Sequence, residues 1–158
     1  YFYRSTMGLE QVYFDIPSVA GWTPYYQTPS YHEIWVNSVT LPLRYTLTSG
    51  LVNKIRIRNV TGQAGLDLIS YINGFADPGN AAKLIQDIAD HLLPKPLESQ
   101  QYDFLKSKLL GPGTEQQWTA IWNNYKSNPS NTQAKTVVEN RLKPLFVSLL
   151  SMPEYFLS

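Results

Sequence analysis

Cysteine is absent from the 158 residues, and histidine occurs only twice. The lack of cysteine excludes disulfide bonds, thiolate metal sites and cysteine nucleophiles. Thirteen basic and twelve acidic side chains leave a net charge of +1. This balance argues against a nucleic-acid-binding protein, whose affinity depends on many phosphate contacts from lysine and arginine. No apolar run approaches the roughly eighteen residues of a membrane-spanning helix, so no membrane span is predicted.

The chain opens at Tyr1 with YFYRSTMGLE, which contains neither an initiator methionine nor the basic and apolar segments of a signal peptide. An aromatic, helical opening without a cap is typical of a cut made inside a larger protein. We therefore expect a fragment or a processed product, whose export signal would have been lost upstream.

The most unusual stretch runs from Asp15 to Leu43 and combines many prolines with many large aromatic rings. Proline lacks an N–H donor and has a fixed φ, so this density excludes a helix interior or a central strand. Burial of some rings is expected to hold such a loop in one shape. We predict one long ordered loop over residues 12–36, whose aromatic members are Trp22, Tyr25, Tyr26, Tyr31 and Trp35.

Two interpretations of these rings remain open. Exposed tryptophan and tyrosine faces bind sugar rings or partner proteins well. Alternatively, Trp22 and Trp35 anchor the loop on the helices, while Tyr25, Tyr26 and Tyr31 stay exposed. All of them are retained as candidate binding residues. No catalytic residue, metal ligand or cofactor is predicted.

Helices are predicted on both sides of the loop. Residues 1–11 are typical of the tail of a helix that ends near Gly8, since glycine suits the left-handed helix stop. Asn37 or Thr40 can cap the next helix. That helix is expected to end at Gly50.

Residues 54–58, KIRIR, alternate basic and apolar side chains, which favours a very short strand. An extended linker or a helical turn is also compatible with so short a segment. The basic row could meet a phosphate or an acidic sugar, but a charged edge that discourages aggregation is the favoured interpretation. A short helix is predicted over residues 66–73, stopped by Gly74.

The second half of the chain has clearer helical patterns. Asp77 followed by Pro78 predicts a helix start. Apolar residues then recur at helical spacing: Ala81, Leu84, Ile85, Ile88, Ala89, Leu92 and Leu93. Ser99 is expected to start another helix, which continues to the break at residues 111–113.

Two capping boxes are predicted in the last part of the chain, Thr114 with Gln117 and Ser130 with Gln133. Pro144 is expected to kink or split the final helix. Residues 37–158 thus form the helical part of a single domain over 1–158. The predicted class is mainly α, an irregular helical bundle with one long Pro- and aromatic-rich ordered loop and at most a very short β element near 54–58.

The two histidines are the natural candidates for acid–base or metal chemistry. His91 follows Asp87 by one helical turn, but two ligands on one helix leave a divalent ion under-coordinated. A solvated helix face is the favoured interpretation. His32 and Glu33 are neighbours in the predicted loop, where adjacent side chains point in different directions. Nucleophile-elbow, Walker and zinc-binding helix motifs are absent from the sequence.

The run MGLEQVYFDIPSVAGWTP, followed by WVNSVTLPLR, resembles the C-terminal part of the bacterial "domain of unknown function 1800" family. The matching positions are Pro17, Val19, Gly21, Trp22, Trp35, Thr40, Leu41 and Arg44. The stretch LLPKPLESQQYDFL and the ending LLSMPEYFLS are similar to that family's later helices and closing motif. The resemblance implies a mostly helical, exported bacterial protein (periplasmic, cell-surface or secreted) and a large N-terminal portion that is missing here. It implies no particular activity.

These observations favour a non-catalytic domain with a role in binding or assembly. The expected partners are a carbohydrate or another exported protein, together with the missing N-terminal portion of the same polypeptide. An alternative is the wall or lid of a hydrolase whose catalytic residues lie in that missing portion. A stand-alone enzyme that uses His32 and Glu33 is the least favoured hypothesis.

Overall fold

The computed structural model describes residues 6–9, 12, 36–56 and 61–156. This part of the chain is mainly helical, as the sequence predicts. The elements are α2 (Thr40–Asn53), β1 (Ile55–Arg56), β2 (Gln63–Ala64), α3 (Leu68–Ile72), α4 (Ala81–Leu92), α5 (Ser99–Leu110), α6 (Glu115–Ser127), α7 (Thr132–Leu149) and α8 (Pro153–Phe156).

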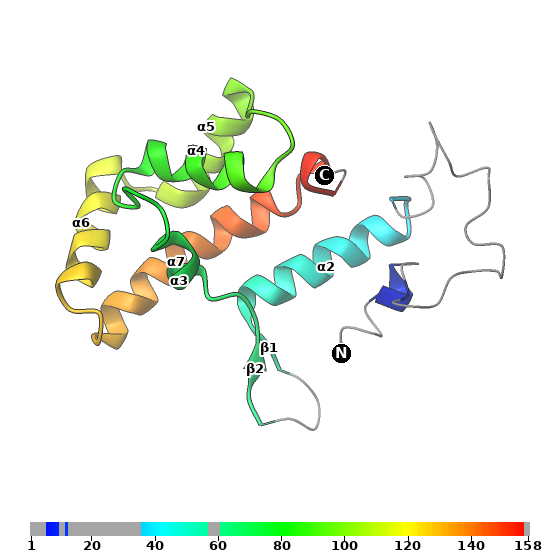
Figure 1. Cartoon of the computed structure of the whole chain (residues 1–158), viewed down its shortest axis with the longest axis horizontal. Coiled ribbons are helices and arrows are strands. Elements are labelled where there is room, and N and C mark those ends of the chain that lie inside the picture. Colours follow the sequence, from blue (N-terminus) through cyan, green and yellow to red (C-terminus); the bar gives the residue numbers. More distant parts are fainter. Residues whose placement is uncertain (1–5, 10–11, 13–35, 57–60, 157–158) are drawn as a thin grey trace.

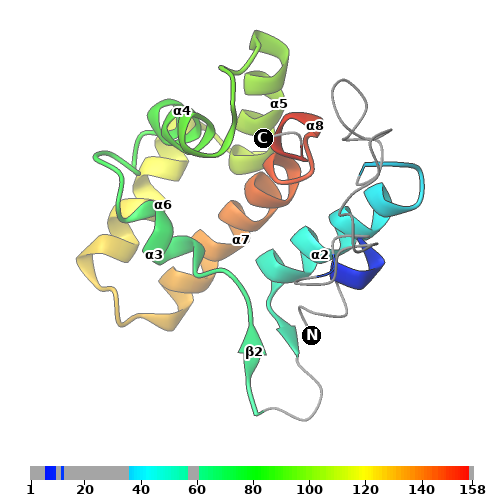
Figure 2. The same cartoon turned by 45° about the vertical axis from the view of Figure 1, so that its right-hand side comes forward.

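Helix α7 is the centre of the molecule. Figures 1 and 2 show it running through the middle, with α4, α5 and α6 on one side and α2 on the other. Its apolar residues recur at helical spacing, so one face can enter the core while the opposite face stays in water. The buried residues of α7 are Ala134, Val138, Leu142, Leu145, Phe146 and Leu149.

Helix α4 buries the apolar face that its sequence predicts. Ala81, Leu84, Ile85, Ile88 and Ala89 are all buried in the core. Each fully buried leucine or isoleucine removes enough apolar surface from water to contribute about 1.5–3 kcal/mol. The prediction of an amphipathic helix here is confirmed.

The short β element is an antiparallel hairpin that extends away from the helices (Figure 2). Ile55 pairs with Ala64, and Arg56 pairs with Gln63. The expected helix end at Gly50 is wrong, because α2 continues to Asn53. A Cβ on Gly50 would lie 2.8 Å from Cδ1 of Ile55, so the glycine gives β1 room beside the helix instead of stopping it.

The helix starts are partly those that the sequence predicts. The capping box of Thr114 with Gln117 is present at the start of α6. Ser130 is not a cap, because the side chain of Asn131 accepts bonds from the first turn of α7. Asp77 does not cap α4 either, and Asn80 takes that position with a bond from the backbone N–H of Lys83.

Helix α3 differs from expectation, and for α7 one of the two expected effects of Pro144, a split, does not occur. Helix α3 is shorter than predicted, because Asp67 is its N-cap and Leu68 its first residue. Helix α7 runs through Pro144 without being split. Both Pro144 and Asn140, whose carbonyl loses its helical partner, are exposed, so water can replace the missing hydrogen bond.

Candidate functional site

The aromatic candidates of the predicted loop, Trp22, Tyr25, Tyr26, Tyr31 and Trp35, lie outside the described residues. The same holds for His32 and Glu33. Their proposed roles remain predictions. The described residues contain a different candidate, an apolar pocket beside the central helix.

This pocket, called here the α2–α8 pocket, has a volume of about 250 Å³. Ligand pockets of this kind are mostly apolar and carry a few fixed polar groups. The lining side chains come from α2, the segment between β2 and α3, α3 itself, α4, the end of α7, and α8. They are Thr48, Leu51, Leu66, Asp67, Leu68, Tyr71, Leu92, Phe146, Leu150 and Tyr155.

A backbone contact brings the two sides of the pocket together. The N–H of Leu66 donates to the carbonyl oxygen of Leu51 at 2.9 Å. This bond joins the segment that follows β2 to the end of α2. Leu66 is 41% exposed. It therefore forms an outer wall of the pocket and is not part of the core.

Asp67 supplies the charge of the pocket. Its Oδ1 accepts the backbone N–H of Ser70 at 3.1 Å, and its Oδ2 accepts the Ser70 hydroxyl at 3.0 Å. The backbone bond from Ser70 is the main reason that the pKa of Asp67 is lowered, with the positive charges of Lys54 and Lys135 adding to it. The carboxylate is thus held in one place and stays ionised at neutral pH.

Tyr71 and His91 form a pair at the edge of the pocket. The Tyr71 hydroxyl lies 2.7 Å from Nδ1 of His91, and the two rings are stacked with their centroids 5.7 Å apart. Burial raises the pKa of Tyr71 above its ordinary value, which favours the protonated phenol still further. Sequence patterns give no sign of this pair, because its members are twenty residues apart on different helices.

The structure does not support a metal site at His91. Within the described ranges, no three His, Asp or Glu side chains come close enough to share a metal ion. His91 itself is exposed near the end of α4, as the solvated-face interpretation predicts. The contact of His91 with Tyr71 could not be predicted from the sequence.

The basic row is partly structural. Nζ of Lys54 forms an ion pair with Oε1 of Glu139 on α7 at 3.2 Å. Arg56 is exposed on β1, and Arg58 lies outside the described residues. The Lys54 contact joins the end of α2, where the hairpin begins, to α7, so we do not include this row in the site.

A second hollow, of about 330 Å³, lies between the turn before α4 and the start of α6. It is wide open, and polar side chains such as Asp77, Asn80 and Thr119 line it. Glu115, also in the lining, is ion-paired with Lys106. The more enclosed and more apolar α2–α8 pocket is the better candidate for binding.

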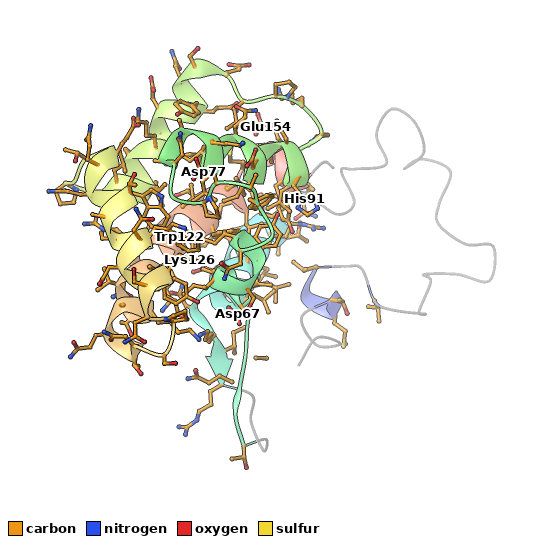
Figure 3. The ribbon with its side chains drawn as sticks, turned by 60° about the vertical axis from the view of Figure 1, so that its left-hand side comes forward. Asp67, Asp77, His91, Trp122, Lys126 and Glu154 are labelled. Atoms are coloured by element: carbon orange, nitrogen blue, oxygen red, sulfur yellow. The ribbon has the colours of Figure 1, made fainter. Side chains whose placement is uncertain are left out.

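Glu154 fastens α8, and with it Tyr155, over one end of the pocket. Its Oε1 accepts a hydrogen bond from Nε2 of Gln101 at 2.8 Å and lies 3.7 Å from Nζ of Lys95. In the view of Figure 3, Asp67 lies toward the hairpin end, Glu154 toward the opposite end, and His91 between them. The pKa of Glu154 is lowered, chiefly by its own backbone N–H and then by Gln101.

The contacts of Glu154 with Gln101 and Lys95, called here the Glu154 clamp, predict an effect of pH on stability. Because the pKa of Glu154 is lower in the folded than in the unfolded chain, its contribution is present above the unfolded value of about 4.3 and lost as the pH falls through the folded value. Glu154→Gln should lower the urea midpoint at about pH 7, and the difference from the wild-type chain should shrink toward about pH 3. Asp103→Asn, which changes an exposed carboxylate on α5, is the control and should track the wild-type chain. A Glu154→Gln midpoint equal to wild type at neutral pH would argue against the clamp.

Comparisons with protein-family models, with curated proteins and with solved structures found no match to this chain. The resemblance to the "domain of unknown function 1800" family therefore remains a prediction from the quoted residues. Among the helices of the described ranges, none combines the length and the apolar character needed to cross a membrane.

Proposed function

We propose that this chain is a non-catalytic binding domain of an exported bacterial protein, and that it holds its ligand in the α2–α8 pocket. The observation that carries this proposal is the pocket itself, a space of about 250 Å³ walled mainly by leucine and aromatic side chains. Such a lining favours apolar groups, because their burial releases water from both surfaces.

The resemblance to the "domain of unknown function 1800" family supports the exported, bacterial part of this proposal. A carbohydrate, another exported protein and a missing N-terminal portion of the same polypeptide are the partners that the sequence predicts. Unsubstituted sugars need many hydrogen bonds, which the apolar pocket does not offer. A carbohydrate would therefore belong to the aromatic residues Trp22, Tyr25, Tyr26, Tyr31 and Trp35, and an apolar ligand to the pocket.

Filling the pocket from α2 should block binding. Thr48 lines the pocket, and within the described part of the chain its hydroxyl donates to carbonyl oxygens of its own helix. Thr48→Phe should weaken binding of the neutral fluorescent probe N-phenylnaphthylamine by at least about tenfold, a loss of roughly 1.4 kcal/mol. The increase in probe fluorescence during titration measures the effect.

Thr46→Phe is the matched control. Thr46 lies on the same helix, is exposed, and donates its hydroxyl to the carbonyl of Pro42 at 2.9 Å, but it does not line the pocket. This variant should bind the probe as the wild-type chain does. Equal binding by Thr48→Phe and wild type would place the probe elsewhere and contradict the proposed site.

A further inference from the structure

The polar side chains at the α2 and α3 walls of the pocket offer acceptors to a ligand. The Thr48 hydroxyl already donates to the carbonyl oxygens of Arg44 and Tyr45, each at 3.1 Å, which leaves its oxygen lone pairs. The Asp67 carboxylate accepts from Ser70 alone among the described residues. A carboxylate has about four lone-pair positions, so each Asp67 oxygen can accept another bond.

The backbone at this wall and the charges of the lining side chains also favour a ligand that donates hydrogen bonds. The N–H of Leu66 is already used in its bond to Leu51, so this wall supplies no free backbone donor at that position. Of the described residues that line the pocket, none is lysine, arginine or histidine, and Asp67 carries the charge. A ligand that offered another acceptor would be repelled or left without a partner at this wall.

We propose that the α2–α8 pocket binds a small amphiphilic amine, with its aliphatic body among the leucines and its ammonium group on the Asp67 carboxylate. This inference rests on the proposed function, because it specifies the ligand class of the same pocket. The ammonium group brings three donors to a wall of acceptors. Ion pairing between a fixed carboxylate and a donor also makes this hydrogen bond stronger than a neutral one.

Arg44 is a competing positive charge, as are Lys54 and Lys135, which act on Asp67 directly, and the experiment must separate their effect from that of the carboxylate. Arg44 lies one turn before Thr48 on α2, and its guanidinium carbon is 5.9 Å from the ring centre of Phe156. Its position beside α8 would favour a ligand with an anionic head group. Two ligands with the same aliphatic chain separate these effects. An amine should bind better if Asp67 determines the preference, and a carboxylate should bind better if Arg44 does.

The test uses n-octylamine, n-octanol and octanoate, which share a chain length and differ in the head group. Binding to the 158-residue chain is followed at neutral pH by the backbone amide NMR shifts of the pocket residues. We expect octylamine to bind best and octanoate worst. Because Asp67 is exposed, the octylamine advantage over octanol should be about five- to tenfold and not larger.

Asp67→Asn removes the charge while keeping a residue that caps helices well, so α3 should stay folded. In this variant octylamine should bind about as weakly as octanol, whereas octanol binding should be unchanged. Asp103→Asn, the charge-matched control on α5, should keep the preference for the amine. If octanoate binds best, or if Asp67→Asn leaves the preference intact, the amine inference is wrong while the pocket stands. If none of the three compounds shifts the pocket amides, the proposed function fails as well.

Discussion

Replacing Trp118 with alanine is expected to lower the free energy of unfolding by about 3–5 kcal/mol, the range seen for large buried aromatic residues. The Trp118 side chain is only 2% exposed, and its ring stacks on that of Trp122 at a centroid distance of 6.3 Å. For a domain of this size the melting temperature should fall by roughly 10 °C. Urea and thermal unfolding measure the two quantities independently.

The indole N–H of Trp118 has a second role, which a conservative variant isolates. It donates to the carbonyl oxygen of Pro78 at 2.9 Å, and this buried bond joins α6 to the turn before α4. The neighbouring Thr119 hydroxyl donates to the carbonyl of Gly79 at 2.8 Å. Trp118→Phe keeps a ring in the core but leaves the Pro78 carbonyl unpaired, so it should cost about 1–3 kcal/mol.

Phe104→Ala serves as the control for loss of an aromatic ring. Phe104 is 50% exposed on α5 and meets Nζ of Lys108 at 4.7 Å from its ring centre. Its removal should change the free energy of unfolding by no more than about 1 kcal/mol. If Trp118→Ala were as mild as this control, α6 would not be packed on the core as the structure has it.

The hydrogen bond from Trp118 to the Pro78 carbonyl explains why one helix start could be predicted from the sequence and another could not. The Thr114 box depends on residues three apart and needs no tertiary contact, so the sequence alone was sufficient. Asp77 and Pro78 have the chemistry of a helix start, but the Pro78 carbonyl bonds to Trp118, forty residues away. That contact sets the turn, and Asn80 becomes the cap of α4 instead.

The pocket was beyond sequence reasoning for a similar reason. The apolar periodicity of the helices predicts which faces are buried, and the buried residues of α4 follow it. It does not predict where a space remains between two such faces. The pocket between Thr48 on α2 and Tyr155 on α8 is a space of this kind. The exposed Leu66 carries no sequence signal that distinguishes it from a core leucine.

Gly65→Ala should open the junction on which the pocket depends. A Cβ on Gly65 would lie 2.7 Å from the carbonyl oxygen of Leu51 and 2.8 Å from Cα of Lys54, and both are backbone atoms that cannot turn aside. The methyl group would therefore push β2 away from α2 and stretch the bond from Leu66 to Leu51. Such overpacking is expected to cost about 1–3 kcal/mol of unfolding free energy.

The variant should also lose affinity for N-phenylnaphthylamine, since Leu66 and Asp67 follow Gly65 directly and both line the pocket. Urea unfolding and the probe titration thus report on one structural change by separate routes. Gly8→Ala is the matched control, because its Cβ would make only an ordinary 3.5 Å contact with Leu43, and it should be nearly neutral in both measurements. If Gly65→Ala is as stable as wild type and binds the probe equally well, then the hairpin does not need to approach α2 this closely, and its strand cannot be what shapes the pocket wall.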